Sequence, residues 1–286
     1  MKEFPIPVRT SGPGSQPVEG DELQYLAMPR EMATFRMPVV PERVDALPLA
    51  EARAALASLL QEMQRWDPAE SPHGPQLDLD GMSAAALEIT NQMLGEGEVS
   101  VRIDGPSGFL IQESVFTGLW RVCAREGGGA LAGDWIEAGA MPRVVGEAAR
   151  RAAAARVADV AIPPGAMNSP ALIAEIAAQT RARQRPGAAH VINLTLFPMT
   201  PDDHAVLERA LPVGPVAIMS RGFGNCRITS TGTRDVWRVQ YFNNMNTLIL
   251  NTIEIVDLPE VALAAVEDLE DTRIRLADLV DWMGEP

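Results

Sequence analysis

The sequence is poor in the residues that most often build metal sites and disulfide frameworks. Its 286 residues include two cysteines and three histidines, and aromatic residues make up 5% of the chain. Cys123 and Cys226 stand far apart and neither belongs to a CxxC pair, which excludes a disulfide framework and the simplest iron–sulfur or thioredoxin-like sites. None of His73, His190 and His204 has a second His or Cys at ligand spacing, so no local zinc site is expected.

Motifs of the common catalytic folds are also missing. There is no GxSxG nucleophile motif and no phosphate-binding Walker loop. The glycine pairs in Gly95–Gly97 and Gly222–Gly224 lead from helix to strand or from strand to strand, which is the wrong setting for a dinucleotide fingerprint. Cys226 follows the second of these turns, and it is either a reactive thiol or, by default, a small half-buried side chain. These absences predict a protein that is not an enzyme and holds no cofactor.

Long apolar stretches and a basic surface are absent as well. No run of about 20 apolar residues suits a membrane span, and the first residues lack the apolar core of a signal peptide, so we expect a cytoplasmic protein. The net charge of −14 argues against binding nucleic acid or an anionic membrane surface, and it favours solubility or a basic partner. A composition of 47% hydrophobic and 22% charged residues is ordinary for a globular protein.

What the sequence does contain is an internal repeat with an offset of 117 residues. The offset carries Trp120-Arg121-Val122 onto Trp237-Arg238-Val239 without a gap. Further matched positions in the same register are Leu77 and Leu194, Leu79 and Leu196, Met82 and Met199, Leu94 and Leu211, Gly97 and Gly214, Val99 and Val216, Gly105 and Gly222, Ile111 and Ile228, Ile136 and Ile253, Glu137 and Glu254, Pro142 and Pro259, and Val144 and Val261. A register of this length predicts duplication of one structural module.

Local patterns predict the same elements in both copies. Each copy reads as a short strand, a helix and a meander of about four strands, with N-caps expected at Ser83 and Thr200. Connections between the meander strands are too short for parallel crossovers. The predicted fold class is therefore α+β, a tandem duplication of a strand–helix–antiparallel meander module with a helical connector and a C-terminal helix.

The chain is expected to divide into four segments. Residues 1–48 carry eight prolines and are predicted to be an extended segment. Residues 49–142 would hold a helix and the first repeat, and residues 143–190 a helical connector with helices at Arg143–Val157 and Ala171–Arg183. Residues 191–286 would hold the second repeat, beginning with a strand at Val191–Phe197, and the C-terminal helix. The acidic residues of Glu260–Pro286 are interpreted as a solvated helix face.

Five charged residues are candidates for binding a partner. Glu96 and Glu98 flank Gly97 in the first copy, where the second copy has Val213 and Pro215, so the turn itself does not require acids. They form either a solvated turn or a loop that recognises a basic segment. The other three candidates are Arg121, Arg234 and Arg238. Strand alternation places the tryptophan before Arg121 and Arg238 on the core face and the arginine on the opposite face. Each arginine is then a structural partner of Glu137 or Glu254 on a neighbouring strand, or an interaction hot spot.

Several phrases of the sequence resemble a known family. They are LGEGEVSVRI (Leu94–Ile103), IQESVFTGLWRV (Ile111–Val122), INLTLFPMTPDD (Ile192–Asp203), GFGNCRITSTGTRDVWRVQ (Gly222–Gln240) and IEIVDLPEVALAAVEDL (Ile253–Leu269). As a set they resemble the HyaF/HupH family of hydrogenase expression/formation proteins, and the resemblance runs from about Leu77 to Met283.

The resemblance implies a role in the maturation of uptake [NiFe] hydrogenases. The implied function is that of a non-catalytic cytoplasmic chaperone, which binds the precursor of the iron–sulfur small subunit before twin-arginine-dependent export. Other maturation proteins are further partners that the resemblance implies. The family supplies no catalytic residues to carry over. The alternative is an iron or iron–sulfur carrier that uses Cys123, Cys226 or ligands shared between subunits. A pocket lined by acids with raised pKa values would be the first sign of an unrecognised enzyme.

Overall fold

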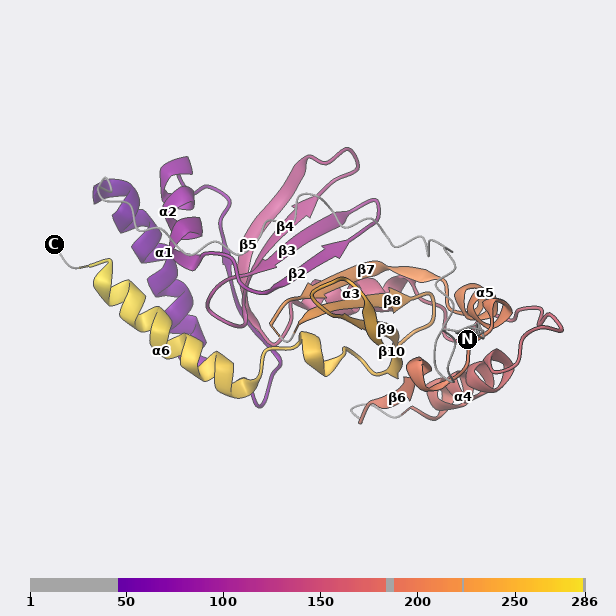
Figure 1. Cartoon of the computed structure of the whole chain (residues 1–286). Coiled ribbons are helices and arrows are strands. Elements are labelled where there is room, and N and C mark those ends of the chain that lie inside the picture. The colour runs from indigo at the N-terminus through magenta and orange to yellow at the C-terminus, as the bar shows by residue number, and fades with distance from the viewer. Residues whose placement is uncertain (1–45, 184–187, 223, 285–286) are drawn as a thin grey trace, which may run out of the picture. The chain divides into compact units, whose positions relative to one another are not determined.

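The computed structural model describes residues 46–183, 188–222 and 224–284. The predicted proline-rich segment, residues 1–48, falls almost wholly outside the described residues. The described residues form six α-helices and one ten-stranded antiparallel sheet (Figure 1). The helices are α1 (Ala46–Arg65), α2 (Ala84–Leu94), α3 (Arg143–Ala152), α4 (Ser169–Ala182), α5 (Pro201–Ala210) and α6 (Val266–Trp282). The strands are β1 (His73–Asp78), β2 (Val99–Ile103), β3 (Gly108–Glu113), β4 (Leu119–Arg125), β5 (Leu131–Gly139), β6 (His190–Asn193), β7 (Val213–Ser220), β8 (Asn225–Thr231), β9 (Val236–Phe242) and β10 (Leu248–Ile255).

The order of the strands shows the duplication directly. The sheet runs β1-β5-β4-β3-β2-β7-β8-β9-β10-β6, so each half is the same five-strand unit and the two units meet at β2 and β7. Val101 pairs with Ile218 across that junction, and these two residues are equivalent under the offset of 117. Pairs on either side of them are exchanged in the same way, since Val99 faces Ser220 and Ile103 faces Val216. The two halves are therefore related by a local pseudo-two-fold axis through this pair, and the predicted tandem duplication is confirmed.

The repeated unit is longer than the sequence comparison from Leu77 onward indicated. The same offset also places α1 on α4, so that Leu56 and Leu59 correspond to Ile173 and Ile176. Leu59 and Ile176 are both buried in their own halves. The helices are hard to match in sequence because even buried positions diverged: Met63 of the α1 core corresponds to Thr180 in α4. Each unit therefore reads helix, strand, helix and meander.

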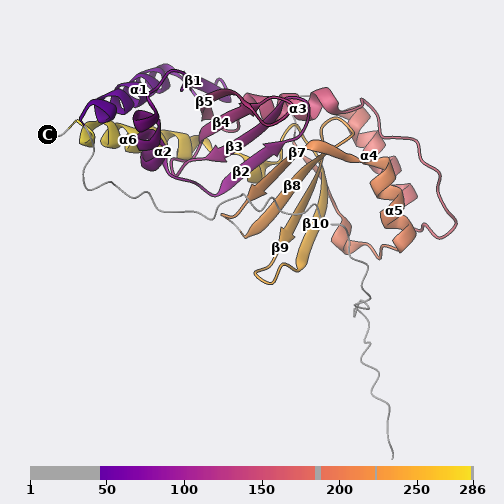
Figure 2. The same ribbon diagram turned by 90° about the horizontal axis from the view of Figure 1, so that it is seen from above.

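Three hydrophobic clusters hold the helices against the sheet. One face of the central strands carries both repeat tryptophans, Trp120 and Trp237, which are 0% and 1% exposed, and α3 packs over that face. The opposite face is covered separately in each half. Helices α1, α2 and α6 pack against the first half and helices α4 and α5 against the second, as Figures 1 and 2 show. Burial of these aromatic side chains makes the tryptophan face the structural core of the sheet.

Both predicted N-caps are present. The Oγ atom of Ser83 accepts a hydrogen bond from the backbone N–H of Ala86 at 3.2 Å. Thr200 and Asp203 form a reciprocal capping box at the start of α5, with distances of 3.1 and 3.0 Å. The Oδ1 atom of Asp203 also accepts the backbone N–H groups at the start of α4, namely those of Met167, Asn168 and Ser169. One carboxylate therefore caps two helices.

Two predicted elements end earlier than expected. The strand predicted at Val191–Phe197 stops at Asn193, whose side chain accepts from the backbone N–H of Thr195 and starts a 3₁₀ turn, Leu194–Leu196. Helix α3 stops at Ala152, although the prediction extended it to Val157. Ala154 exchanges backbone hydrogen bonds with the loop before β9, so a long-range contact overrides the helix propensity of the alanines.

The C-terminal helix belongs spatially to the first half. Helix α6 follows the second repeat in sequence but contributes Leu276, Val280 and Met283 to the cluster around α1 and α2. Thr272 on α6 also donates a hydrogen bond to the backbone carbonyl of Thr117 at 2.8 Å. Among the described residues, no helix combines the length and the apolar character needed to cross a membrane.

Candidate functional site

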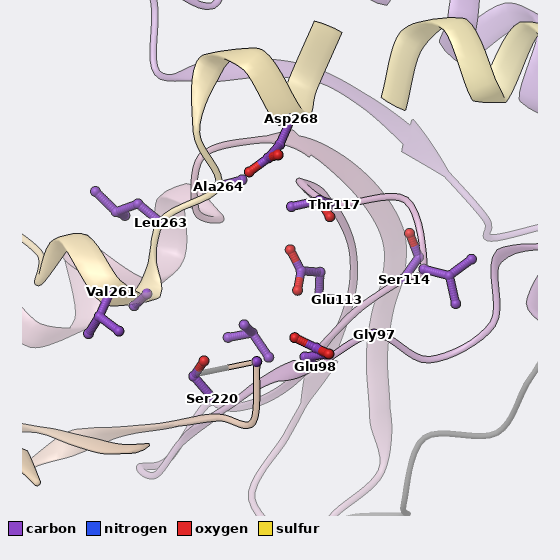
Figure 3. Close-up of a pocket in the computed structure, with 14 residues that line it drawn as sticks. Gly97, Glu98, Glu113, Ser114, Thr117, Ser220, Val261, Leu263, Ala264 and Asp268 are labelled. Carbon is purple, nitrogen blue, oxygen red and sulfur yellow. The ribbon is translucent and has the colours of Figure 1, made fainter. Parts of the chain in front are cut away.

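A cavity of about 430 Å³ lies where the two halves meet at the start of β2. Its walls come from the turn before β2, the end of β3, the end of β7 and the segment that leads into α6. The lining residues are Gly97, Glu98, Val99, Glu113, Ser114, Val115, Thr117, Ser220, Gly222, Val261, Ala262, Leu263, Ala264 and Asp268. None of these residues is basic, and three of them are carboxylates. Figure 3 shows Glu113 in the middle of the space, with Asp268 and Glu98 on either side of it.

Glu113 is the buried acid of this cavity. Strand alternation puts it on the tryptophan face, where a charged side chain is unusual, and it is only 6% exposed. Its Oε1 atom accepts the backbone N–H of Gly118 at 3.1 Å. Burial raises the pKa of Glu113 to about 7; backbone hydrogen bonds from Gly118 and Val99 lower it, and the nearby Glu98 and Asp268 raise it further. This carboxyl group therefore changes its charge close to neutral pH.

Two glycines let the backbone close the floor of the cavity. A Cβ atom at Gly97 would lie 2.3 Å from the carbonyl oxygen of Ser114, so only glycine fits this approach. Gly118 has φ = +80° and lies against Leu269, where a Cβ would be 2.2 Å from Cδ2 of that side chain. Gly97, in the cavity lining, therefore lets the turn before β2 approach the end of β3 closely.

The pseudo-symmetry relates the cavity to the surface beside the start of β7, where the two halves differ. The residues equivalent to α3 in the second repeat are 260–269, but they form a single 3₁₀ turn, Glu260–Ala262, before the chain leaves as α6. Helix α3 packs along β7, whereas its counterpart leaves the matching start of β2 uncovered. Two of the acids that line the cavity are not acids in the other half. Glu98 corresponds to Pro215, and Glu113 corresponds to Ser230, in the half that α3 covers.

The structure separates the two predicted acids. Glu98 is exposed and lines the cavity, beside Gly222, where an added Cβ would lie 2.2 Å from the carboxylate. Glu96 lies on the same turn but does not line the cavity. Glu113 and Asp268 were not predicted. For Glu113 the available signal was a charged residue on the apolar face of an alternating strand; Asp268 was interpreted as part of a solvated helix face.

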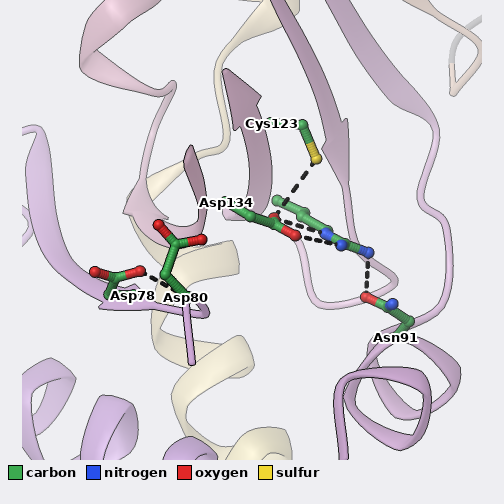
Figure 4. Close-up of polar contacts among 6 residues, drawn as sticks. Asp78, Asp80, Asn91, Cys123 and Asp134 are labelled. Atoms are coloured by element: carbon green, nitrogen blue, oxygen red, sulfur yellow. Dashed lines mark hydrogen bonds and ion pairs between the residues drawn. The ribbon is translucent and has the colours of Figure 1, made fainter. Parts of the chain in front are cut away.

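Arg121 lies on the opposite face of the sheet and has its own partners. Its Nε and Nη2 atoms donate to the carboxylate of Asp134 on β5 at 3.0 and 2.6 Å, and Nη1 donates to Asn91 on α2 (Figure 4). The predicted partner Glu137 is instead the cross-strand neighbour of Trp120, on the tryptophan face. The prediction failed because residues paired across two strands share a face, and Glu137 is paired with the tryptophan. Arg121 therefore joins α2 to the sheet.

The other two predicted arginines do not join this group. Arg238 is half-buried at the position equivalent to Arg121, and burial lowers the pKa of its guanidinium, which Glu208 partly offsets. In the described part of the chain, no carboxylate lies within ion-pair distance of Arg238. Arg234 is exposed on the turn between β8 and β9. The five predicted partner-binding residues thus lie on several surfaces and do not form a single site.

The two cysteines lie on opposite faces of the sheet. Cys123 is half-buried beside Arg121, its Sγ atom donates to Asp134 at 3.5 Å, and burial raises the pKa of its thiol. Cys226 is 1% exposed within the tryptophan face, where burial raises the pKa of its thiol to about 11. Within one chain these two thiols cannot reach a common metal. The raised pKa of each thiol disfavours the thiolate form of a reactive cysteine.

The cavity is the best candidate for a functional site. No cluster of three or more His, Cys, Asp and Glu side chains in the described ranges is arranged to hold a metal ion. The hydroxyl groups in the lining belong to Ser114, Thr117 and Ser220, and no histidine or lysine in the lining could activate them. The cavity is lined by acids and burial raises the pKa of Glu113, which is the sign expected of an unrecognised enzyme, since such a carboxyl group can act as a general acid or base. It stands here without a nucleophile–base pair. The arrangement is better suited to holding a cation.

Comparisons with known proteins assign the chain to a family. The model of the family described as "HupH hydrogenase expression protein, C-terminal conserved region" matches residues 49–161 and again residues 166–283. The two matches start at the offset of the internal repeat, which carries residue 49 to residue 166. They include α1 and α4, in agreement with the longer repeat seen in the structure.

Curated relatives match over nearly their whole length. The hydrogenase expression/formation protein HoxQ of Cupriavidus necator is 44% identical over 285 residues, 99% of each chain. HupH of Rhodobacter capsulatus is 40% identical over 98% of each chain, and the hydrogenase-1 operon protein HyaF of Escherichia coli is 34% identical over 96% of this chain and 95% of its own. The chain belongs to the HupH family of hydrogenase expression proteins.

Proposed function

We propose that this protein is a non-catalytic accessory factor in the maturation of an uptake [NiFe] hydrogenase. In this role it acts in the cytoplasm as a chaperone, which binds the precursor of the iron–sulfur small subunit before its twin-arginine-dependent export. The observation that carries the proposal is the full-length similarity to proteins named for hydrogenase expression and formation. The sequence resemblance, which spans both repeats, is what narrows the role to the small subunit.

Features of the described residues support a binding role over a catalytic one. The cavity combines a buried carboxylate with apolar walls and lacks a nucleophile–base pair. An open cavity that presents carboxylates and apolar side chains without such a pair suits recognition of another chain.

Affinity capture tests the proposal. The tagged full-length protein is expressed with the hydrogenase genes, and the captured proteins are compared for a small subunit with and without its leader, with the large subunit as a matched control. We expect the small-subunit precursor to be retained through washing and the large subunit, expressed alone, to be lost. Absence of any hydrogenase subunit from the captured material would contradict the chaperone role.

The two arms with and without the leader separate two modes of recognition. Retention only with the leader places the contact on the signal peptide, and equal retention places it on the folded subunit. Charge reversal of Glu96 and Glu98 then tests the acidic turn. Because Glu98 lines the cavity and Glu96 does not, we expect Glu98→Arg to weaken capture and Glu96→Arg to leave it unchanged.

The alternative, an iron or iron–sulfur carrier, receives less support. The two cysteines of the chain lie on opposite faces of the sheet. Burial raises the pKa of both thiols, which disfavours the thiolate form that binds iron. Iron content and visible absorption of protein purified without oxygen distinguish the two functions. A stoichiometric, cysteine-dependent iron signal would favour the carrier.

A further inference from the structure

We propose that the cavity at the start of β2 binds the side chain of an arginine from a polypeptide partner. This inference deepens the proposed function, because it states which chemical feature of the client the protein recognises. It rests on the shape of the cavity, the composition of its walls and the comparison between the two halves, none of which depends on the identity of the client.

The cavity is large enough to hold a side chain of a partner. A volume of about 430 Å³ lies within the range of small-ligand sites, and it is large enough for one long side chain together with part of its backbone. Its walls belong to both repeats and to the segment that enters α6, so it is formed by the assembled fold. In the second half, α3 packs along β7, the strand equivalent to β2.

The walls match the two parts of an arginine side chain. Val99, Val115, Val261 and Leu263 offer apolar surface for the methylene stem. Glu113 and Asp268 supply oxygen atoms for the guanidinium, and Figure 3 shows Glu113 between Asp268 and Glu98. A planar guanidinium with five N–H donors is suited to two or more carboxylates at once, whereas lysine presents a single compact charge.

The charge of the cavity has no counterpart among its own lining residues. Glu98, Glu113 and Asp268 are the titratable groups that line it, from the turn before β2, from β3 and from α6, and no lining residue is cationic. Burial raises the pKa of Glu113, and the charges of Glu98 and Asp268 raise it further because each disfavours a negative charge on Glu113. A bound guanidinium relieves this repulsion. The residue equivalent to Glu113 in the second half is Ser230, so the backbone does not need an acid at this position.

The first experiment uses a model peptide and needs no client protein. The full-length protein is titrated with acetyl-Ala-Arg-Ala-amide and, in parallel, with the same peptide containing citrulline, the neutral isostere of arginine. Binding is measured by calorimetry and by shifts of the backbone amide signals of Gly97, Thr117 and Gly118. We expect the arginine peptide to shift these signals and the citrulline peptide to bind about tenfold more weakly, a difference of about 1.4 kcal/mol.

Matched variants place the binding in the cavity. Glu113→Gln and Asp268→Asn are expected to weaken binding of the arginine peptide about tenfold. Glu96→Gln serves as the control, since Glu96 lies on the same turn but outside the lining, and it is expected to bind as the unchanged protein does. Thermal unfolding curves verify that each variant is folded. Binding to the unchanged protein should weaken from pH 8 to pH 6 as Glu113 takes up a proton, and Glu113→Gln should remove this dependence.

The outcomes separate this inference from the proposed function. Equal binding of both peptides, no binding of either, or unchanged binding by Glu113→Gln and Asp268→Asn would each overturn the arginine site. Equal binding of a lysine peptide would replace the arginine by any basic side chain. Capture of the small-subunit precursor by the same variants is measured separately. Loss of peptide binding with retained capture would leave the chaperone role standing and remove the cavity from it.

Discussion

The two halves of the sheet agree closely where the backbone sets the geometry. Ser114 in the first half and Thr231 in the second each make the same side-chain turn, accepting from the backbone N–H two residues ahead at 3.2 Å. Gly97 and Gly214 both lie against the neighbouring strand, where a Cβ would approach to 2.3 and 2.5 Å. These positions tolerate few side chains, so both copies kept residues that perform the same task.

The halves differ at the end of the repeat, where the chain continues differently. In the first half the buried carboxylate of Glu137 accepts the backbone N–H of Arg143 at 2.9 Å, at the start of α3. In the second half the equivalent residues are Glu254 and Glu260, and burial together with the charge of Glu260 raises the pKa of Glu254. The first copy continues into a helix that covers the sheet, and the second leaves after one 3₁₀ turn. The cavity lies beside this point of divergence, since Val261, Leu263 and Ala264 line it.

The largest expected effect concerns what the halves share. Trp120→Ala and Trp237→Ala each remove a fully buried indole whose Nε1–H donates to a backbone carbonyl, at 2.9 and 3.2 Å. We expect each substitution to lower the free energy of unfolding by about 3–5 kcal/mol. Chemical denaturation measures the change. Trp282→Ala, at a side chain that is 46% exposed, is the control and should change stability by less than about 1 kcal/mol. A tryptophan in one half that proved dispensable would break the equivalence of the two cores.

A smaller difference is expected at the paired arginines. Arg121→Met leaves Asp134, which is 4% exposed, without its bidentate partner, and we expect a loss of about 2–3 kcal/mol. Arg238→Met removes a half-buried guanidinium whose pKa burial already lowers, and we expect it to be neutral or slightly stabilising. Urea denaturation of the two variants, measured side by side, checks the contrast. Equal losses would show that Arg238 contributes as much as Arg121 does.

The next prediction concerns a carboxylate that caps two helices in the second half and has no equivalent in the first. Asp203 caps α4 and α5, whereas the equivalent residue in the first half is Ala86. Burial raises the pKa of Asp203, but the backbone N–H groups of Ser169 and Thr200 outweigh this effect and hold the pKa well below its ordinary value. Its stabilisation is therefore present above the ordinary pKa and is lost as the pH falls.

Asp203→Asn is accordingly expected to cost about 2 kcal/mol at neutral pH and less in acid. Unfolding curves recorded between pH 7 and pH 3 measure the difference between the variant and the unchanged protein. Asp202→Asn, one residue earlier, is the matched control and should follow the unchanged protein across this range. A pH-independent loss in Asp203→Asn would mean that the carboxylate charge is not what holds the two helix ends.

Much of this comparison could be predicted from the sequence. The offset of 117, the caps at Ser83 and Thr200 and the buried tryptophans all followed from local rules, because each depends on residues that are neighbours in the chain or repeat in register. The extent of the repeat was predicted less well. Helices α1 and α4 preserve only a few packing positions, and a single buried stripe carries too little sequence identity to be matched.

The candidate site was predicted only in part, because it depends on contacts between distant segments. Glu98 was noticed as an acid that its turn did not require, and it does line the cavity. Glu113 and Asp268 are separated by more than a hundred residues, and no local pattern indicates that α6 returns to the first half. The pairing of Arg121 with Asp134 also depends on the register of β4 and β5, which strand alternation alone does not determine.

The smallest expected effect is a gain of stability at Glu113. The pKa of this carboxyl group is raised from 4.5 to about 7, so the folded state favours the protonated form, and the free energy of unfolding falls as the pH rises through this interval. Glu113→Gln removes the cost of a buried charge, and we expect it to stabilise the protein by about 1–2 kcal/mol at pH 8 and by little at pH 5.

Glu113→Ser tests the comparison most directly, because Ser230 occupies this position in the second half and its Oγ accepts the backbone N–H of Val216 at 3.0 Å. If the acid serves binding and the backbone needs only an acceptor, the serine variant should fold with at least the stability of the unchanged protein at pH 8. A marked loss of stability there would show that Glu113 is needed to hold β2 and β3 together, and that the two halves solve the same structural problem with different chemistry.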